Sequence, residues 1–336
     1  MQASELLNRI TKAKRSQTRL LAHVLQEDPV LGEKIKWCGG WLHFREWIES
    51  QETRLLNANF CKKHLLCQAC AVRRAAKMNE GYTPKIESIA AQFPNLIPAM
   101  VTLTTKNGPD LGERIHHTKK RGWSSMLEAK RKAVSNPKKN LPIEWNKVVG
   151  SLRALEITMG KDGQWNVHMH IFVLLTDYMD QRKLSEEWKR FTGDSSIVDV
   201  RKCRGGIHVG LLEVLKYACK FSSMTPEQTF EVHQTCTGHR LIDPQGILRG
   251  VPEPDIDSDS IEGLTGPYRD FIAKWIQSHS RYSISYLSQE PLKVIRPERP
   301  ALDLPALPPL KLKPMDYDRA ALLLKLVNRK PAELRR

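Results

Sequence analysis

Two long stretches with strand-like composition, 151–160 (SLRALEITMG) and 165–175 (WNVHMHIFVLL), constrain this chain more than any other feature. Both are rich in apolar and β-branched residues, and polar residues tend to alternate with them. The residues between them, from Gly160 to Gly163, have the composition of a tight turn. The two stretches therefore predict a β-hairpin. A third strand-like run at 97–105 (IPAMVTLTT) predicts that the hairpin belongs to an antiparallel sheet.

The second strand of this hairpin presents two histidines on one face. Alternation sends the odd-numbered residues toward the core and places His168 and His170 together on the opposite face. An isolated His-x-His pair is more often an exposed strand face than a metal site. If the hairpin turns near residue 162, Glu156 lies directly across from His168. Two imidazoles and one carboxylate suit a catalytic divalent ion such as Mn²⁺ or Mg²⁺.

The charge balance favours a polyanionic partner. The 336 residues include 53 Lys and Arg against 37 Asp and Glu, a formal net charge of +16. Nucleic acid is the leading candidate, although basic proteins also bind anionic membranes or acidic proteins. Residues 114–153 are especially basic, and we expect them to be helical and to supply much of the DNA affinity. Because no secretory leader and no long apolar run are found, we expect a cytoplasmic protein without membrane association.

The stretch 208–223 (HVGLLEVLKYACKFSS) is expected to form an amphipathic helix. At about 100° per residue, Glu213, Tyr217 and Lys220 fall on one narrow face. Taken alone, this is the pattern of an ordinary surface helix with ion pairs. A basic chain that presents a Thr-rich strand, a His-x-His strand and then this helix points to catalysis instead.

Four of the seven cysteines lie in the first 70 residues of the sequence, and the other three are scattered. In the cytoplasm thiols stay reduced, so clustered cysteines favour a metal site over disulfides. Cys61, Cys67 and Cys70, with Cys38 upstream, offer four thiolates, enough for a tetrahedral Zn²⁺ site. The alternative is a group of reduced structural cysteines. In the metal site, His64 could replace one thiolate.

In their order along the chain, these motifs resemble those of the HUH endonucleases, and among them the rolling-circle replication initiators of small bacterial plasmids. MVTLTTKN (100–107) resembles the first family motif, WNVHMHIFVL the His-hydrophobic-His metal motif, and EVLKYACK (213–220) the tyrosine motif. FCKKHLLCQACAVRRAAK (60–77) is similar to the segment that precedes these motifs in one plasmid subfamily, with Gln68 where Pro is expected. The resemblance covers about residues 37–250.

The resemblance implies a metal-dependent, sequence-specific DNA nickase and strand transferase. Tyr217 would attack a phosphodiester, become joined to the 5′ phosphate and leave a 3′ hydroxyl as primer. A Mn²⁺ or Mg²⁺ ion on the two histidines and Glu156 would polarise the phosphate, and Lys220 would position it. Glu213 would activate water for the terminating cleavage. The implied partners are origin DNA, as a hairpin with a single-stranded nick site, and a host helicase and polymerase.

We therefore expect an α+β fold, with an antiparallel-sheet HUH nuclease palm, flanking helices and an N-terminal cysteine-rich zinc-type module. The predicted divisions are a mainly helical region 1–85 with the cysteines, a nuclease domain 90–290, and a proline-rich linker with a short helix at 291–336. Smaller predicted elements are a helix at 180–191, a strand at 195–203 and a hairpin at 239–250 that turns at 243–246.

Predicted DNA contacts come from two basic runs, one beside the cysteines and one in the basic segment: Arg73, Arg74, Lys119, Lys120, Arg121, Lys130 and Arg131. Two alternative functions remain open. A transposase or mobilisation relaxase of the same superfamily would share the nick but not the role of Glu213. A non-catalytic, zinc-containing DNA-binding regulator would carry the histidine pair incidentally.

Overall fold

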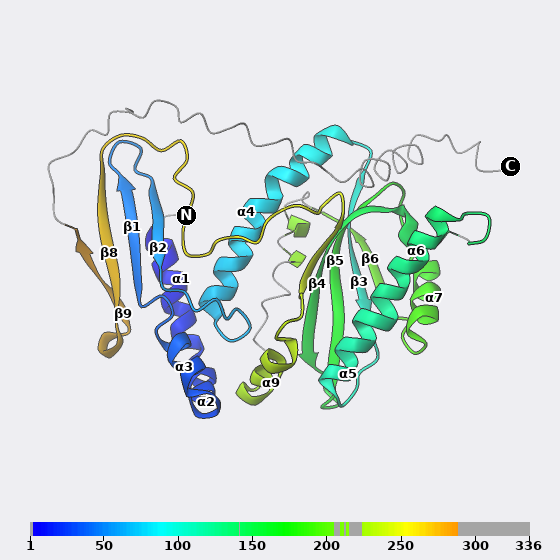
Figure 1. Cartoon of the computed structure of the whole chain (residues 1–336), viewed down its shortest axis with the longest axis horizontal. Coiled ribbons are helices and arrows are strands. Elements are labelled where there is room, and N and C mark those ends of the chain that lie inside the picture. Colours follow the sequence, from blue (N-terminus) through cyan, green and yellow to red (C-terminus); the bar gives the residue numbers. More distant parts are fainter. Residues whose placement is uncertain (1–2, 141, 205–208, 212, 215–223, 288–336) are drawn as a thin grey trace. The chain divides into compact units, whose positions relative to one another are not determined.

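The computed structural model describes residues 3–140, 142–204, 209–211, 213–214 and 224–287, all within one compact unit, residues 1–292 (Figure 1). They form two antiparallel sheets with helices packed against them, which confirms the expected α+β fold. The linker and helix predicted at 291–336 lie outside the described residues.

The five-stranded sheet has the order β6 (Val198–Lys202), β3 (Ile97–Thr104), β5 (Trp165–Leu175), β4 (Val148–Met159) and β7 (Ile242–Gly246). The four-stranded sheet has the order β2 (Thr53–Ala58), β1 (Trp41–Trp47), β8 (Tyr268–Ile276) and β9 (Arg281–Tyr286). The helices are α1 (Ala3–Ser16), α2 (Thr18–Glu27), α3 (Pro29–Lys36), α4 (Gln68–Gln92), α5 (Leu111–His116), the π-helix η1 (His117–Ser124), α6 (Ser125–Ser135), the short 3-10 helices η2 (Glu144–Lys147) and η3 (Gln277–His279), α7 (Gln181–Thr192) and α9 (Pro226–Cys236).

Strands β4 and β5 form the predicted hairpin at the centre of the five-stranded sheet, in the predicted register. Glu156 lies opposite His168, and the turn passes through Gly163, whose φ of +71° favours glycine. Strands β3 and β6 and helix α7 also form where the sequence predicts them. The hairpin therefore fixes the placement of the candidate ligands on its own.

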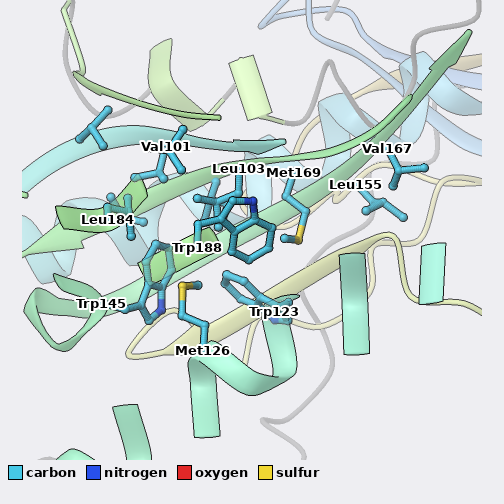
Figure 2. Close-up of a cluster of buried hydrophobic side chains, with 14 of the residues drawn as sticks. Val101, Leu103, Trp123, Met126, Trp145, Leu155, Val167, Met169, Leu184 and Trp188 are labelled. Carbon is cyan, nitrogen blue, oxygen red and sulfur yellow. The ribbon is translucent and has the colours of Figure 1, made fainter. Parts of the chain in front are cut away.

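One face of this sheet packs on a large apolar core. The odd-numbered residues of β5 contact side chains from η1, α6, η2 and α7 (Figure 2). The indoles of Trp123 and Trp145 meet edge to face, with ring centroids 5.3 Å apart. Trp188 is fully buried, and its Nε1 donates to the Thr104 carbonyl at 2.8 Å. The basic segment is thus partly helical, as predicted, and its apolar residues anchor it to the sheet.

The opposite face, which carries the histidines, is covered as well. Strand alternation predicts a core on the odd face alone, but Phe172 and Leu174 on the even face are also buried. Helix α4 covers them, because Met78, Tyr82, Ile86 and Ile89 share one side of that helix and pack into the same cluster. The sheet is therefore buried on both faces along much of β5, and the histidines lie at the edge of a packed layer.

The N-terminal region differs from its mainly helical prediction. Residues 41–58 form β1 and β2, which pair with each other and, through β1, with β8. The physical reason is visible in WLHFREW (41–47), where Leu42 and Phe44 are buried and the alternate residues Trp41, His43 and Arg45 are more exposed. Helices α1 to α3 supply the rest of this core, together with Phe271 and Ala273 of β8.

The hairpin predicted at 239–250 is also wrong in detail. Residues 242–246 form the edge strand β7, in which Ile242 lies opposite Ala154 of β4, and the turn follows at 247–250. Ile242 and Leu248 are both buried in the cluster beneath α4. An extended β7 brings both residues to this core, whereas a turn at 243–246 would separate them.

Candidate metal centre

Three side chains from the central hairpin converge on one point. Glu156 comes from β4, and His168 and His170 come from β5. Their ligand atoms all lie within 4.8 Å of one another. Glu156 Oε2 is 2.8 Å from His170 Nε2 and also contacts His168 Nε2. The imidazole planes are perpendicular, with centroids 5.0 Å apart, so both Nε2 atoms point at the same carboxylate oxygen.

Hydrogen bonds on the far side of each imidazole fix its orientation. His170 Nδ1 lies 3.2 Å from the hydroxyl of Thr102, and His168 Nδ1 lies 2.9 Å from Asn166 Oδ1. An amide oxygen only accepts, so Nδ1 of His168 donates to Asn166 and Nε2 faces Glu156. Outer hydrogen bonds of this kind orient histidines that bind metals. Two imidazoles and one carboxylate that meet in this way are a donor set that fits a divalent ion.

The centre is nearly shielded from solvent. Glu156 is 4% exposed and His170 is 9% exposed. Burial alone would raise the pKa of Glu156, but hydrogen bonds with His168 and His170 hold it well below its ordinary value. Glu156 therefore stays ionised, as a metal ligand must.

The predicted catalytic helix begins over the same face of the sheet. The described residues 209–211 and 213–214 are helical, and Leu211 and Val214 are buried against the even face of the sheet. A Cβ on Gly210 would lie 3.3 Å from the ring of Phe172, two residues beyond His170. Glu213 is exposed, as predicted for the polar face. The other two predicted catalytic residues, Tyr217 and Lys220, lie outside the described residues.

The four predicted cysteines also converge. Cys38 Sγ lies 3.4 Å from Cys70 Sγ and 3.5 Å from Cys67 Sγ, and Cys61 Sγ lies 3.5 Å from Cys70 Sγ. A tetrahedral site with Zn–S bonds of about 2.3 Å requires sulfur atoms about 3.8 Å apart, close to these distances. The converging group consists of four thiols, and His64 is not among them.

The four thiols share their protons, and a lysine lies beside them. Hydrogen bonds among the thiols lower the pKa of Cys67 well below its ordinary value and raise the pKa of Cys38 and Cys70 above theirs. Burial lowers the pKa of Lys14 below its ordinary value, and the negative charge of the nearby cysteines opposes this shift. A zinc ion with four thiolates carries a net charge of −2, and the ammonium of Lys14 offsets part of it.

The predicted DNA contacts beside the cysteines are engaged within the protein. Arg73 is 3% exposed, donates to the Ile256 carbonyl at 3.0 Å, and pairs with Asp259 at 2.8 Å. Arg74 pairs with Glu253 at 2.6 Å. The acidic segment 252–262 thus packs against the basic start of α4. For Arg73 the prediction is wrong, because a buried and fully paired guanidinium anchors this segment and is not available to DNA.

The predicted contacts in the basic segment divide into two groups. Lys120, Arg121 and Arg131 are exposed. Lys119 Nζ lies 3.2 Å from His239 Nδ1, and the ammonium of Lys130 is turned inward to the Val148 carbonyl. The first group remains a predicted DNA surface, whereas Lys130 is held against the sheet.

Two residues of the centre were not singled out from the sequence. Thr102 and Asn166 hold the imidazoles, and both have the same strand parity as the residues they support. Thr102 lies directly opposite His170, and Asn166 precedes His168 by two residues. The polar residues on the histidine face of β3 and β5 could therefore have been identified from the sequence as candidates for holding the imidazoles.

Comparison with known proteins places the chain in a family. The family model named Rep_1, described as replication protein, matches residues 52–270. The chain belongs to the Rep_1 replication protein family. This confirms the resemblance to rolling-circle plasmid replication initiators and favours an initiator over a transposase or relaxase.

Several curated relatives are each named Protein rep. The one from Bacillus amyloliquefaciens is 28% identical over 255 residues, which cover 65% of this chain and 71% of the relative. One from Bacillus sp is 29% identical over 182 residues, 52% of this chain and 55% of the relative. One from Lentilactobacillus hilgardii is 24% identical over 288 residues, 75% of this chain and 87% of the relative.

No solved structure matches the chain significantly. Among the residues that the structure describes, no helix is both long and apolar enough to cross a membrane.

Proposed function

We propose that this initiator nicks and rejoins origin DNA as a metal-dependent endonuclease of the HUH type. The observation that carries the proposal is the convergence of Glu156, His168 and His170 on one point, with the outer nitrogens of both imidazoles already hydrogen-bonded. Three protein ligands would leave coordination positions of a divalent ion for a phosphate oxygen. A bound Mn²⁺ or Mg²⁺ ion would withdraw charge from the scissile phosphate.

Tyr217 is the proposed nucleophile. Its phenol oxygen forms a bond to phosphorus while the bond from phosphorus to the 3′ oxygen breaks. The 3′ oxygen leaves as a hydroxyl after taking up a proton, and the 5′ phosphate stays joined to the tyrosine. Lys220 is proposed to position the phosphate. The position of Gly210 against Phe172 supports this proposal, because it starts the tyrosine helix over the histidine face.

Glu213 is the proposed base for the terminating cleavage. It lies one helical turn before Tyr217 in the sequence, and its side chain belongs to an exposed position of the described helix. A carboxylate there would take a proton from water, so that the last cleavage ends in hydrolysis. A host helicase and polymerase would then act on the nicked origin.

The cysteine cluster is proposed to hold a structural zinc ion. Its four thiols come from the end of α3, the segment after β2 and the start of α4, so the ion would tie these parts together. The closed set of four ligands suits a structural role rather than a catalytic one.

Covalent trapping tests the nucleophile. The protein is incubated with Mn²⁺ and single-stranded oligonucleotides that scan a candidate origin, and protein joined to DNA is separated on a denaturing gel. Tyr217→Phe should form no adduct, and the exposed Tyr286→Phe should form as much as the wild type. An adduct with Tyr217→Phe would reject this nucleophile, and no adduct on any strand would favour the DNA-binding regulator.

A second assay tests the base. Glu213→Ala should nick normally but accumulate covalent product in place of released, rejoined circles. Glu231→Ala, an exposed glutamate of α9, is the matched control. Normal release by Glu213→Ala would show that another group activates water.

A further inference from the structure

One face of the four-stranded sheet packs on an apolar core, and the other face carries mainly polar and aromatic side chains. Leu42 and Phe44 of β1 and Phe271 and Ala273 of β8 point into the core beneath α1 to α3. The alternate residues of β1 therefore point to the other side. They are Trp41, His43, Arg45 and Trp47. Pairing places Lys274, Ile272, Asp270 and Tyr268 of β8 beside them. We call this side the outer face.

One end of the outer face is built as a rigid platform. Arg45 makes two hydrogen bonds to Asp270, Nε to Oδ1 at 2.8 Å and NH2 to Oδ2 at 3.0 Å. Its guanidinium lies 3.7 Å from the ring centroid of Tyr268 and covers Trp47. His43 Nε2 reaches the same carboxylate at 3.1 Å. Paired in this way, Asp270 presents no uncompensated negative charge.

The other end of the outer face is open and basic. Trp41 is 36% exposed, an unusual position for a large aromatic side chain, and lies directly opposite the exposed Lys274. The exposed Arg281 begins β9 at the far edge of this end. Arg54 of β2 lies opposite Arg45, at the platform end, and pairs with Glu52. Within the described part of the chain, no ion pair involves Lys274 or Arg281. The acidic residues on this side, Asp270 and Glu52, are paired with Arg45 and Arg54, so Lys274 and Arg281 supply its positive charge.

This composition matches one class of partner. A row of basic side chains follows a phosphate backbone, and an exposed indole beside it offers a flat surface on which an unpaired base can stack. Duplex DNA hides its bases from such contacts, and an acidic protein has no use for the aromatic ring. A second copy of the chain would bring the same positive charge to the interface.

We propose that the outer face of the four-stranded sheet binds single-stranded nucleic acid, with Trp41 as the stacking platform and Lys274 and Arg281 on the backbone. The site is separate from the metal centre, since all of its residues belong to the other sheet. It goes beyond the proposed nicking activity and does not depend on Tyr217. An initiator that exposes single-stranded DNA at its origin would use such a face to hold it.

The test is equilibrium binding of the full chain to a labelled oligothymidine of about 20 nucleotides, long enough to span a sheet of this kind. Fluorescence anisotropy is measured without added divalent metal, so that no cleavage contributes. Trp41→Ala and Lys274→Ala should each weaken binding by about tenfold. Lys274→Ala should also reduce the slope of log affinity against log salt by about 0.7.

The matched control is the double variant Lys36→Ala/Trp37→Ala. It removes an exposed lysine and an exposed indole at the end of α3, outside both sheets. It should bind within about twofold of the wild type. Trp41→Phe keeps a ring for stacking and should recover most of the affinity, which separates a lost contact from a damaged fold.

Three results would overturn the proposal. The first is wild-type affinity in both Trp41→Ala and Lys274→Ala. The second is an equal loss in the Lys36/Trp37 control. The third is that a duplex of the same length binds as tightly as the single strand, and that Trp41→Ala weakens the binding of both by the same factor. Nicking of origin oligonucleotides with Mn²⁺ is measured separately, so a failed nickase and a failed binding face give different patterns.

Discussion

The variant Gly122→Ala would test how firmly α7 holds strand β3, which carries the Thr102 hydroxyl beside His170. Gly122 of η1 packs against Trp188, and a Cβ there would lie 2.3 Å from Cη2 and 2.9 Å from Cζ3 of the indole. The indole has no free space to move into, because it is fully buried and its Nε1 donates to the Thr104 carbonyl at 2.8 Å. Gly122→Ala must therefore displace the ring or the helix.

The cost follows from three contributions. Overpacking a core costs about 1–3 kcal/mol. Loss of the Trp188 hydrogen bond adds about 1 kcal/mol, and replacing glycine by alanine in a helix returns about 1 kcal/mol. The net destabilisation is about 2 kcal/mol, which for a unit of this size lowers the Tm by roughly 4–8 °C.

Thermal unfolding followed by circular dichroism measures this change. Gly112→Ala in α5 is the control, since its Cβ would meet no atom closer than 3.4 Å, and its Tm should equal or slightly exceed that of the wild type. Thr104 pairs with His168 in the β3–β5 register, so Gly122→Ala should also weaken Mn²⁺ binding several-fold. A Tm for Gly122→Ala within about 1 °C of the control would refute the reasoning.

Three further changes test other parts of the structure. Thr102→Val removes the hydroxyl that holds His170 and should lower Mn²⁺ affinity about 10- to 100-fold in calorimetry. We expect metal analysis to find about one zinc per chain in the wild type and in Cys236→Ser, and none in Cys70→Ser, whose Tm should also be lower. Burial lowers the pKa of Lys130 to about 8, so its charge destabilises the fold below pH 8, and this penalty disappears as pH rises toward 10.5. Lys130→Met should therefore stabilise the protein by about 1–2 kcal/mol at pH 7 in urea unfolding, and a gain that persists above pH 10.5 would contradict this cause.

The convergence of Glu156, His168 and His170 was predictable because its geometry is local. Glu156 and His168 face each other across a hairpin whose turn is marked by Gly160 and Gly163, so a short sequence window contains strand parity, register and ligands. The cysteine cluster was predictable for a related reason, since Cys67 and Cys70 have a ligand spacing that few other structures require.

What could not be predicted depends on contacts between distant segments. The burial of Phe172 requires α4, which precedes it by about 80 residues and has its own, separate amphipathic pattern. Arg73 carries the charge of a DNA contact, and only its pairing with Asp259 shows that it has another role. Exposure alternates along β1 and β2 with a period of about two, but both strands are short. Without knowledge of β8, the helical composition of the surrounding region outweighs that signal.

The pairing of β1 with β8 has a consequence for synthesis. Trp41 lies opposite Lys274, so β1 leaves the ribosome about 230 residues before its neighbour, or about 10–50 s earlier at ordinary elongation rates. The five-stranded sheet ends with β7 and is complete before β8 is made. The helices α1 to α3 and the four thiols, although made first, wait for Phe271 and Ala273 to close their core. The part of the chain that is synthesised first is therefore the part that finishes folding last.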